Sequence, residues 1–153
     1  MAEYSANAFQ TVNPGESVAF VLNPVPCNRG FVRWRSGSGA FSLSGWVPSN
    51  GCRCSSKTAQ YLVDFGANIA VPDGQTVGPI SVAFAIDGVT IPDTTMIVTP
   101  AAVEQYFNVS RAANVSVWSG CCQTLTVRNT SSIPILVQNA NIIFSRPDLA
   151  VTY

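Results

Sequence analysis

The stretch QTLTVRNTSSIPILVQNANIIF, residues 123–144, decides the fold class, because its apolar side chains recur with the period of a β-strand. Leu125 and Val127 alternate with polar neighbours, which places both apolar side chains on one face of a strand. The Asn-Thr-Ser-Ser run at 129–132 is typical of a turn. Two further apolar runs, at 135–137 and 141–146, complete what we interpret as the last strands of a sheet.

Working outward from this stretch, strand patterns alternate with Pro- and Gly-rich turns at roughly 8–12-residue spacing, as in a sandwich or barrel. Residues 100–107 are the only helix-like stretch, which we interpret as a helical turn or the start of a strand. We therefore predict one all-β domain over residues 1–153 with about nine or ten short strands. The earlier strands are expected at 17–22, 31–35, 41–46, 60–65, 80–86, 94–98 and 109–118, the last as a strand pair or a bulged strand.

The run 80–86 predicts two different faces. Ile80, Val82, Phe84 and Ile86 lie on one face and are expected to build the core. The opposite face carries small residues, which suggests close packing. We expect that face, or the closing strands, to form a contact between subunits.

Composition excludes several classes of function. Charged residues make up only 10% of the chain, apolar residues 47%, and eight basic residues balance eight acidic ones. A nucleic-acid partner is not expected, because there is no basic excess to neutralise phosphates. A membrane span is not expected either, because the apolar runs are far shorter than roughly 18 residues. The chain has no histidine, so histidine-based catalysis and histidine metal ligands are impossible.

Low charge also predicts self-association. Sixteen charged side chains spread over 153 residues leave much of the surface to Ser, Thr, Asn and apolar groups, and such surfaces are often buried between subunits. The alternative is a monomer with a Ser/Thr/Asn-rich surface. The start of the chain, Met1-Ala2-Glu3-Tyr4, has neither a basic nor an apolar segment typical of a secretory signal. We therefore expect synthesis and folding in a cytoplasm.

The C-terminal runs 114–120, 123–130 and 137–144 carry a family resemblance. A strand of the type "VRNTS" precedes a closing strand of the type "NANIIF", and this order resembles the last strands of C1q/TNF-like jelly rolls, including those of bacterial collagen-like spore-surface proteins. The resemblance implies a two-sheet antiparallel jelly-roll sandwich that forms a homotrimer. The chain departs from the spore proteins in having no Gly-X-Y stalk, so a fibre role would need a separate carrier.

The segments 24–30, 66–72, 76–80 and 97–107 resemble small phage and prophage proteins of gut Firmicutes. This second resemblance implies a structural or decorating subunit of a phage particle, on the head or at the end of a fibre. Its partners would be itself and other virion proteins, and it would be made in the bacterial host cytoplasm. Two alternatives stay open: a glycan- or receptor-binding head on a virion or spore, and a disulfide-linked subunit of a bacterial or spore surface.

The five cysteines point to a possible disulfide more than to a metal site. Their C-x-C and C-C spacings lack the paired C-x2-C pattern of zinc ligands, so no metal or other cofactor is expected. One hypothesis is a bridge from Cys52 or Cys54 to Cys27 or to the Cys121-Cys122 pair. The alternative is five reduced, partly buried thiols.

Aromatic and arginine side chains give the remaining candidates for contact with a partner. Trp34 and Tyr61 alternate as core residues do, whereas Trp46 and Trp118 each stand at a strand end beside a turn. Trp46 and Trp118 are therefore candidates for an interface or for stacking on a sugar ring. Arg33 and Arg35 share one strand face and could meet acidic groups of a neighbouring subunit, or could simply be solvated.

No catalytic arrangement is evident in the sequence. The eight carboxylates show no spacing that would pair two of them across a cleft, as glycoside hydrolysis requires. A serine nucleophile would lack a histidine base, and no glycine-rich loop opens a helix for phosphate binding. We expect a protein that is not an enzyme.

Overall fold

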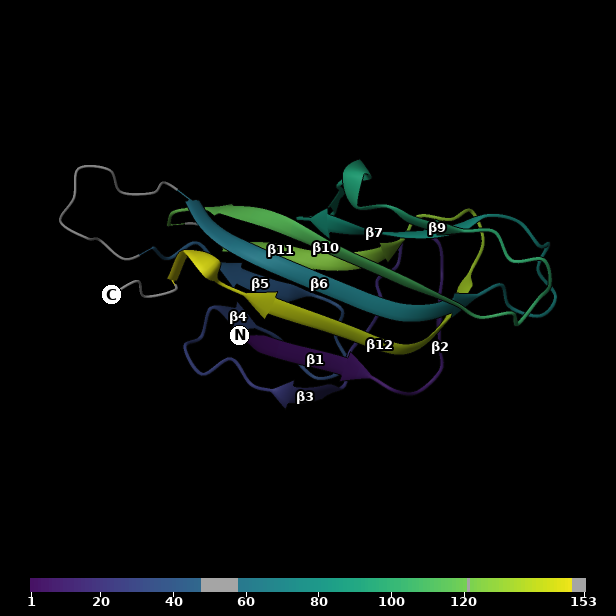
Figure 1. Cartoon of the computed structure of the whole chain (residues 1–153), viewed down its shortest axis with the longest axis horizontal. Helices are drawn as coiled ribbons and strands as arrows, with labels where there is room; N and C mark the ends of the chain where they lie inside the picture. Colours follow the sequence, from purple (N-terminus) through teal and green to yellow (C-terminus); the bar gives the residue numbers. More distant parts are fainter. Residues whose placement is uncertain (48–57, 121, 150–153) are drawn as a thin grey trace.

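The computed structural model describes residues 1–47, 58–120 and 122–149, and these form two antiparallel β-sheets. The first sheet has the strand order β10-β6-β12-β1-β3, and β2 also pairs with β12. Figure 1 shows β6, β10 and β12 side by side along the length of the molecule. The strands of this sheet are β1 (Ala2–Ala6), β2 (Gln10–Val12), β3 (Leu22–Val25), β6 (Thr58–Ala70), β10 (Phe107–Trp118) and β12 (Ile135–Ser145).

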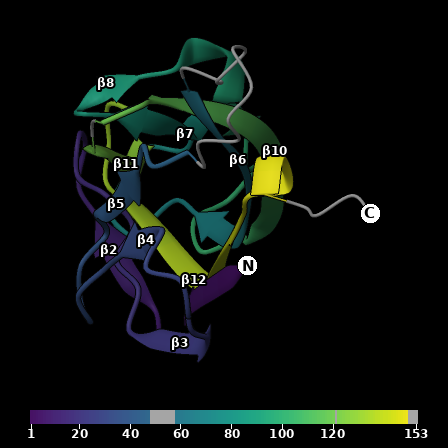
Figure 2. The same cartoon turned by 90° about the vertical axis from the view of Figure 1, so that its left-hand side faces the viewer.

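The second sheet has the order β4-β5-β11-β7-β8, with β9 also paired to β7. Its strands are β4 (Val32–Arg33), β5 (Phe41–Ser44), β7 (Ile80–Ile86), β8 (Val89–Thr90), β9 (Met96–Val98) and β11 (Cys122–Asn129). The end-on view in Figure 2 shows the two layers, and the side chains between them form the hydrophobic core. The predicted all-β sandwich is confirmed. The described residues contain more strands than expected, because strands as short as β2 and β8 show too little alternation in the sequence.

Strand periodicity places the core as predicted. In β6 the side chains of Tyr61, Val63 and Phe65 are buried, while Leu62 and Asp64 point to the other face. The strand is longer than the expected 60–65 because it continues through Gly66 and Asn68, two weak strand formers. Both pair with β10 there, opposite Ser110 and Asn108.

The predicted strand at 17–22 is wrong, although its alternation is right. Val18 and Phe20 are fully buried. The Val18 N–H donates to the Val127 carbonyl of the second sheet at 2.8 Å, and the Val21 N–H donates to the Ser5 carbonyl of the first sheet at 3.0 Å. The segment therefore crosses from one sheet to the other, and β3 begins only at Leu22.

Three other strands differ from the expected boundaries. The run 31–35 forms only a two-residue strand, and 109–118 belongs to one unbroken strand that pairs with β6 along its whole length. The runs 135–137 and 141–146 were expected as separate strands but form the single strand β12. Its register on β6 shifts between Gln138 and Asn141, and Asn139 in between has φ of 53°. This local bulge breaks the alternation that a continuous strand would show.

The small-residue face of β7 is already covered within one chain. Ala83 and Ala85 are fully buried, and their antiparallel partners Arg128 and Thr126 stand beside them on the same face. Arg128 extends across that face, donating hydrogen bonds to the carbonyls of Gly15 and Gly88. Ala83 and Ala85 are therefore not available to a second subunit, and a contact on this face would have to use the side chains beside them.

Turns and short helical segments complete the described structure. Asp87 and Gly88 have φ values of 50° and 83° and form the predicted tight hairpin between β7 and β8. Helical structure in the described ranges is limited to the 3-10 turns Pro92–Thr94 and Pro147–Leu149. Within those ranges no helix has the length and apolar content needed to cross a membrane.

Candidate functional site

A buried arginine organises one end of the sandwich. Arg146 directly follows β12, and its side chain is only 5% exposed. Its Nε and Nη2 atoms donate to the two carboxylate oxygens of Asp148 at 2.8 and 2.7 Å. This two-point contact is the strongest geometry for an arginine–carboxylate pair. The two partners are only two residues apart, because Asp148 lies in the short 3-10 turn Pro147–Leu149. This turn therefore folds back over the end of the sandwich.

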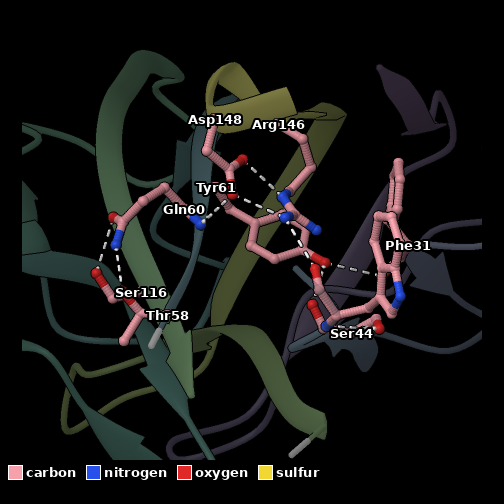
Figure 3. A network of polar contacts seen from close by, with 9 residues as sticks. Phe31, Ser44, Thr58, Gln60, Tyr61, Ser116, Arg146 and Asp148 are labelled. Atoms are coloured by element: carbon pink, nitrogen blue, oxygen red, sulfur yellow. Dashed lines mark hydrogen bonds and ion pairs between the residues drawn. The ribbon is translucent and has the colours of Figure 1, made fainter. Parts of the chain in front are cut away.

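The charges of this pair remain in place despite burial. Burial alone would raise the pKa of Asp148, but hydrogen bonds from Arg146 and from the Gln60 backbone N–H, at 3.1 Å, lower it overall. Burial alone would lower the pKa of Arg146, but its contacts with Asp148 and Tyr61 raise it. The pair is therefore ionised at neutral pH. Figure 3 shows how it joins the end of β12 to β6.

The guanidinium group contacts two aromatic rings. The Arg146 Cζ atom lies 4.9 Å from the centroid of the Phe31 ring and 4.9 Å from that of Tyr61. Burial raises the pKa of Tyr61, so its hydroxyl stays protonated and can donate. That hydroxyl lies 2.7 Å from the Ser44 carbonyl oxygen and 3.1 Å from that of Phe31. Cation–π attraction to Arg146 holds the Phe31 ring, and the hydrogen bond from Tyr61 holds the Phe31 backbone.

Trp46 extends this stack to the surface. Its indole stacks on the Phe31 ring, with centroids 6.2 Å apart and an interplanar angle of 21°. The Arg146 Nη2 also donates to the Trp46 carbonyl at 3.0 Å. The Trp46 residue is 56% exposed. The contacts therefore run from Tyr61 to the Arg146 guanidinium, then to Phe31 and then to Trp46, and we call this arrangement the aromatic stack.

An open hollow lies beside the outer end of the aromatic stack. Its volume is about 560 Å³, and it is lined by Arg29, Gly30, Phe31, Ser44 and Trp46. Gly30 has φ of 70°, a conformation that lets the chain turn tightly between Arg29 and Phe31. The hollow thus combines an indole, a cation and a hydroxyl, as ligand pockets with a few placed polar groups do.

Of the aromatic and arginine candidates predicted from the sequence, one lies at this hollow. Trp46 lines it, whereas Trp118, 60% exposed, stands at the end of β10 and is not among the lining residues. Arg33 and Arg35 are exposed, and Arg33 points away from the core-facing Val32. Tyr61 is in the core as expected, and Trp34 is half-buried against Tyr4 and Phe41.

The described cysteines, Cys27 and Cys122, are free thiols, the first half-buried and the second exposed. Cys52, Cys54 and Cys121, which the predicted bridges involve, lie outside the described residues. In the described ranges no group of three or more His, Cys, Asp or Glu side chains is placed to hold a metal ion.

Sequence reasoning missed Arg29, Phe31, Arg146 and Asp148. The stack joins residues near 30, 45, 60 and 146, and no local pattern relates positions so far apart. The one signal was the Arg-Pro-Asp run at 146–148 in a chain with very few charges. A charged pair that directly follows a closing strand is a candidate for a buried contact.

Solved structures match this chain in fold. The globular domain of zebrafish complement 1qA aligns with a TM-score of 0.59 at 11% identity, covering 93% of this chain and 94% of that chain. Eiger TNF from S. frugiperda aligns with a TM-score of 0.64 at 14% identity, covering 99% of this chain and 93% of that chain. The fold is a C1q/TNF-like jelly roll.

This jelly roll confirms the fold that the C-terminal strands implied. No protein-family model matches the sequence, and no curated protein sequence matches it. At such low identity the structural likeness shows the fold alone, because one fold serves many functions.

Proposed function

We propose that this chain is a non-enzymatic structural subunit that self-associates as a homotrimer. The contact would be the outer face, which we define as the side of β10, β6, β12 and β1 that points away from the core. The observation that carries the proposal is that this face is mostly uncharged, with the carboxylates Glu3 and Asp64 as its charged side chains among the residues below. Its residues include Glu3, Gln60, Leu62, Asp64, Asn68, Ala112, Asn114, Ser116, Asn141 and Ile143.

Several polar side chains of the outer face are paired with one another. Asn108 Nδ2 donates to Asn68 Oδ1 at 3.2 Å, and Ser116 Oγ donates to Gln60 Oε1 at 2.9 Å. Because these side chains already bond within the face, burying them against a second subunit costs less than burying unpaired groups. Leu62, 39% exposed, supplies apolar surface at the centre of this polar ladder.

The second sheet offers a less suitable contact. Its outer side carries Arg33, Arg128 and Asp87, and Arg128 is engaged by backbone carbonyls of its own chain. Burying charges between subunits is costly unless a partner of opposite charge is precisely placed. Among the described residues, a trimer that contacts through the first sheet has to accommodate Asp64 and Glu3, and Glu3 already accepts a hydrogen bond from Asn141 at 2.6 Å.

We place the trimer in a phage particle, on the head or at the end of a fibre, with other virion proteins as neighbours. The support is the resemblance of segments such as 66–72 and 97–107 to small phage proteins. Immunoelectron microscopy of particles from a host carrying the gene tests this placement, and labelled particles are the expected result.

Light scattering after size exclusion tests the self-association. The expected native mass is three times the 16.2 kDa chain, unchanged by reductant. Leu62→Arg, which adds a buried charge at the centre of the outer face, should give a monomer. Val89→Arg is the matched control, because Val89 is 72% exposed in the β7–β8 hairpin outside this face.

A monomeric wild-type chain would contradict the trimer. Larger species that return to the mass of a single chain on reduction would favour the disulfide-linked surface subunit. The exposed thiol of Cys122 could form such a bond between subunits. A Leu62→Arg protein that keeps the mass of three chains would move the contact away from the outer face.

A further inference from the structure

The hollow beside Trp46 presents an aromatic plane to solvent. Trp46 is more than half exposed although its indole is stacked on Phe31. Indole is a large apolar surface, and exposing it against water is unfavourable unless a partner covers it. The flat apolar side of a sugar ring, formed by its C–H groups, matches such a plane in size and shape.

This plane is rigidly held. Trp46 packs on Phe31, Phe31 packs on the Arg146 guanidinium, and that guanidinium is bound by Asp148 in two places. A binding surface that is already ordered loses little conformational entropy when its ligand arrives. The buried contacts of Arg146 and Phe31 thus hold the exposed Trp46 indole in one orientation before a ligand binds.

The positive charge of Arg29 in the hollow has no counter-charge within the described part of the chain. Arg29 is exposed, and it forms no ion pair or hydrogen bond with any residue that the structure describes. Among the lining residues that the structure describes, none is acidic. Arg146, a cation that also contacts Phe31, is occupied by Asp148. A guanidinium group with free N–H groups binds a carboxylate through two parallel hydrogen bonds.

Ser44 provides a further polar group in the lining of the hollow. Its Oγ accepts a hydrogen bond from the Trp46 backbone N–H at 3.2 Å, and its own proton has no acceptor among the described residues. The hydroxyl can therefore donate to a ligand oxygen.

We propose that this hollow binds an acidic saccharide. The sugar ring stacks on Trp46, its carboxylate pairs with Arg29, and a ring hydroxyl accepts from Ser44. This binding activity goes beyond self-association and does not depend on it, because every residue that it uses belongs to one chain.

The test is a titration followed by NMR with trigalacturonic acid and, in parallel, the uncharged galactose trimer of the same linkage. The Trp46 indole Nε1–H signal should shift in a saturable way with the acid, at an affinity about tenfold higher than with the neutral sugar. Trp46→Ala should remove binding of both sugars. Trp46→Tyr should keep most of it, because the aromatic plane remains.

Arg29→Gln should lower the affinity for the acid about tenfold, to that of the neutral sugar. The chain supplies matched controls: Trp118→Ala and Arg33→Gln remove the same side-chain types at exposed positions outside the hollow. Both should bind like the wild type. Sodium acetate, a carboxylate without a ring, should not displace the acid at equal concentration.

Three results would overturn the proposal. They are the absence of saturable binding to the acid, equal affinity for the charged and neutral sugars, and loss of binding in Trp118→Ala equal to that in Trp46→Ala. Native mass measured on the same samples keeps this outcome separate from the proposed self-association.

Discussion

Arg146 keeps a full charge in a place that excludes almost all water. Its guanidinium binds Asp148 through two hydrogen bonds and contacts the rings of Phe31 and Tyr61. A buried charge of this kind is stable only while its partners remain, so removing one partner costs more than the contact itself contributed. The consequence for the molecule is that Asp148, a partly exposed residue near the end of the described chain, governs the packing of Phe31 and Tyr61.

Asp148→Asn should therefore lower the free energy of unfolding by about 2–4 kcal/mol, because it leaves the guanidinium without a counter-charge. The pKa of Asp148 is lower in the folded chain than in the unfolded one. Its ionised form thus stabilises the fold above the unfolded pKa of about 3.9, and this contribution disappears as the pH falls through the lower folded value.

Urea denaturation between about pH 2.5 and pH 7 measures this effect. The wild type should lose stability at the acidic end, and Asp148→Asn should lose less over the same range. Asp73→Asn, at an exposed turn position, is the control and should unfold like the wild type. Equal pH profiles for Asp148→Asn and wild type would show that the pair does not stabilise the fold.

Among the elements, β12 shows most clearly how one backbone angle shapes a sheet. The strand pairs with β2 and β6 before Asn139, and with β1 and β6 after it. The positive φ of Asn139 inserts the extra residue that lets buried side chains face the core on both sides of the bulge. Asparagine tolerates this conformation better than other residues with a side chain.

Asn139→Val should destabilise the chain by about 1–2 kcal/mol, because a β-branched side chain strains the left-handed conformation. Asn139→Gly should unfold close to the wild type. Residue 139 is exposed, so neither change alters the core. Thermal denaturation compares the three proteins, and similar stability of the valine and glycine variants would contradict this account.

The same strand shows what sequence reasoning could and could not predict. Alternation of apolar residues located the buried faces of β6, β7, β11 and both halves of β12. It split β12 because the bulge interrupts the period, and it made the crossing segment 17–22 a strand because its buried residues alternate. In both cases the partner strand decides the outcome, and a local pattern does not identify that partner.

At the scale of the whole molecule, the two sheets differ in what they present to solvent. The second sheet carries arginines on its outer side, whereas the charged side chains on the outer face of the first are the carboxylates Glu3 and Asp64. The candidate site could be predicted only in part: Trp46 stood beside a turn, but Arg29, Phe31 and Arg146 converge through folding alone. The composition predicts a low total charge, but it does not predict on which sheet each charged side chain lies.

A contact made by such a face should respond weakly to salt. Native mass should stay at three chains from about 0.05 M to about 1 M NaCl, because ions screen charged contacts and leave apolar ones intact. Light scattering at both ends of this range checks the expectation. Dissociation at high salt would indicate instead that ion pairs hold the subunits together.

The position of the hollow at one end of the sandwich has a consequence for valency. Rotation about a three-fold axis does not change height along that axis, so the proposed trimer carries three equivalent hollows in one plane. Each would hold its sugar weakly. A surface coated with repeated acidic sugars could occupy all three together, and linked sites of this kind can gain on the order of 10²–10⁴ in avidity without any new contact. The assembly would then bind tightly to dense polysaccharide and only weakly to free sugars in solution.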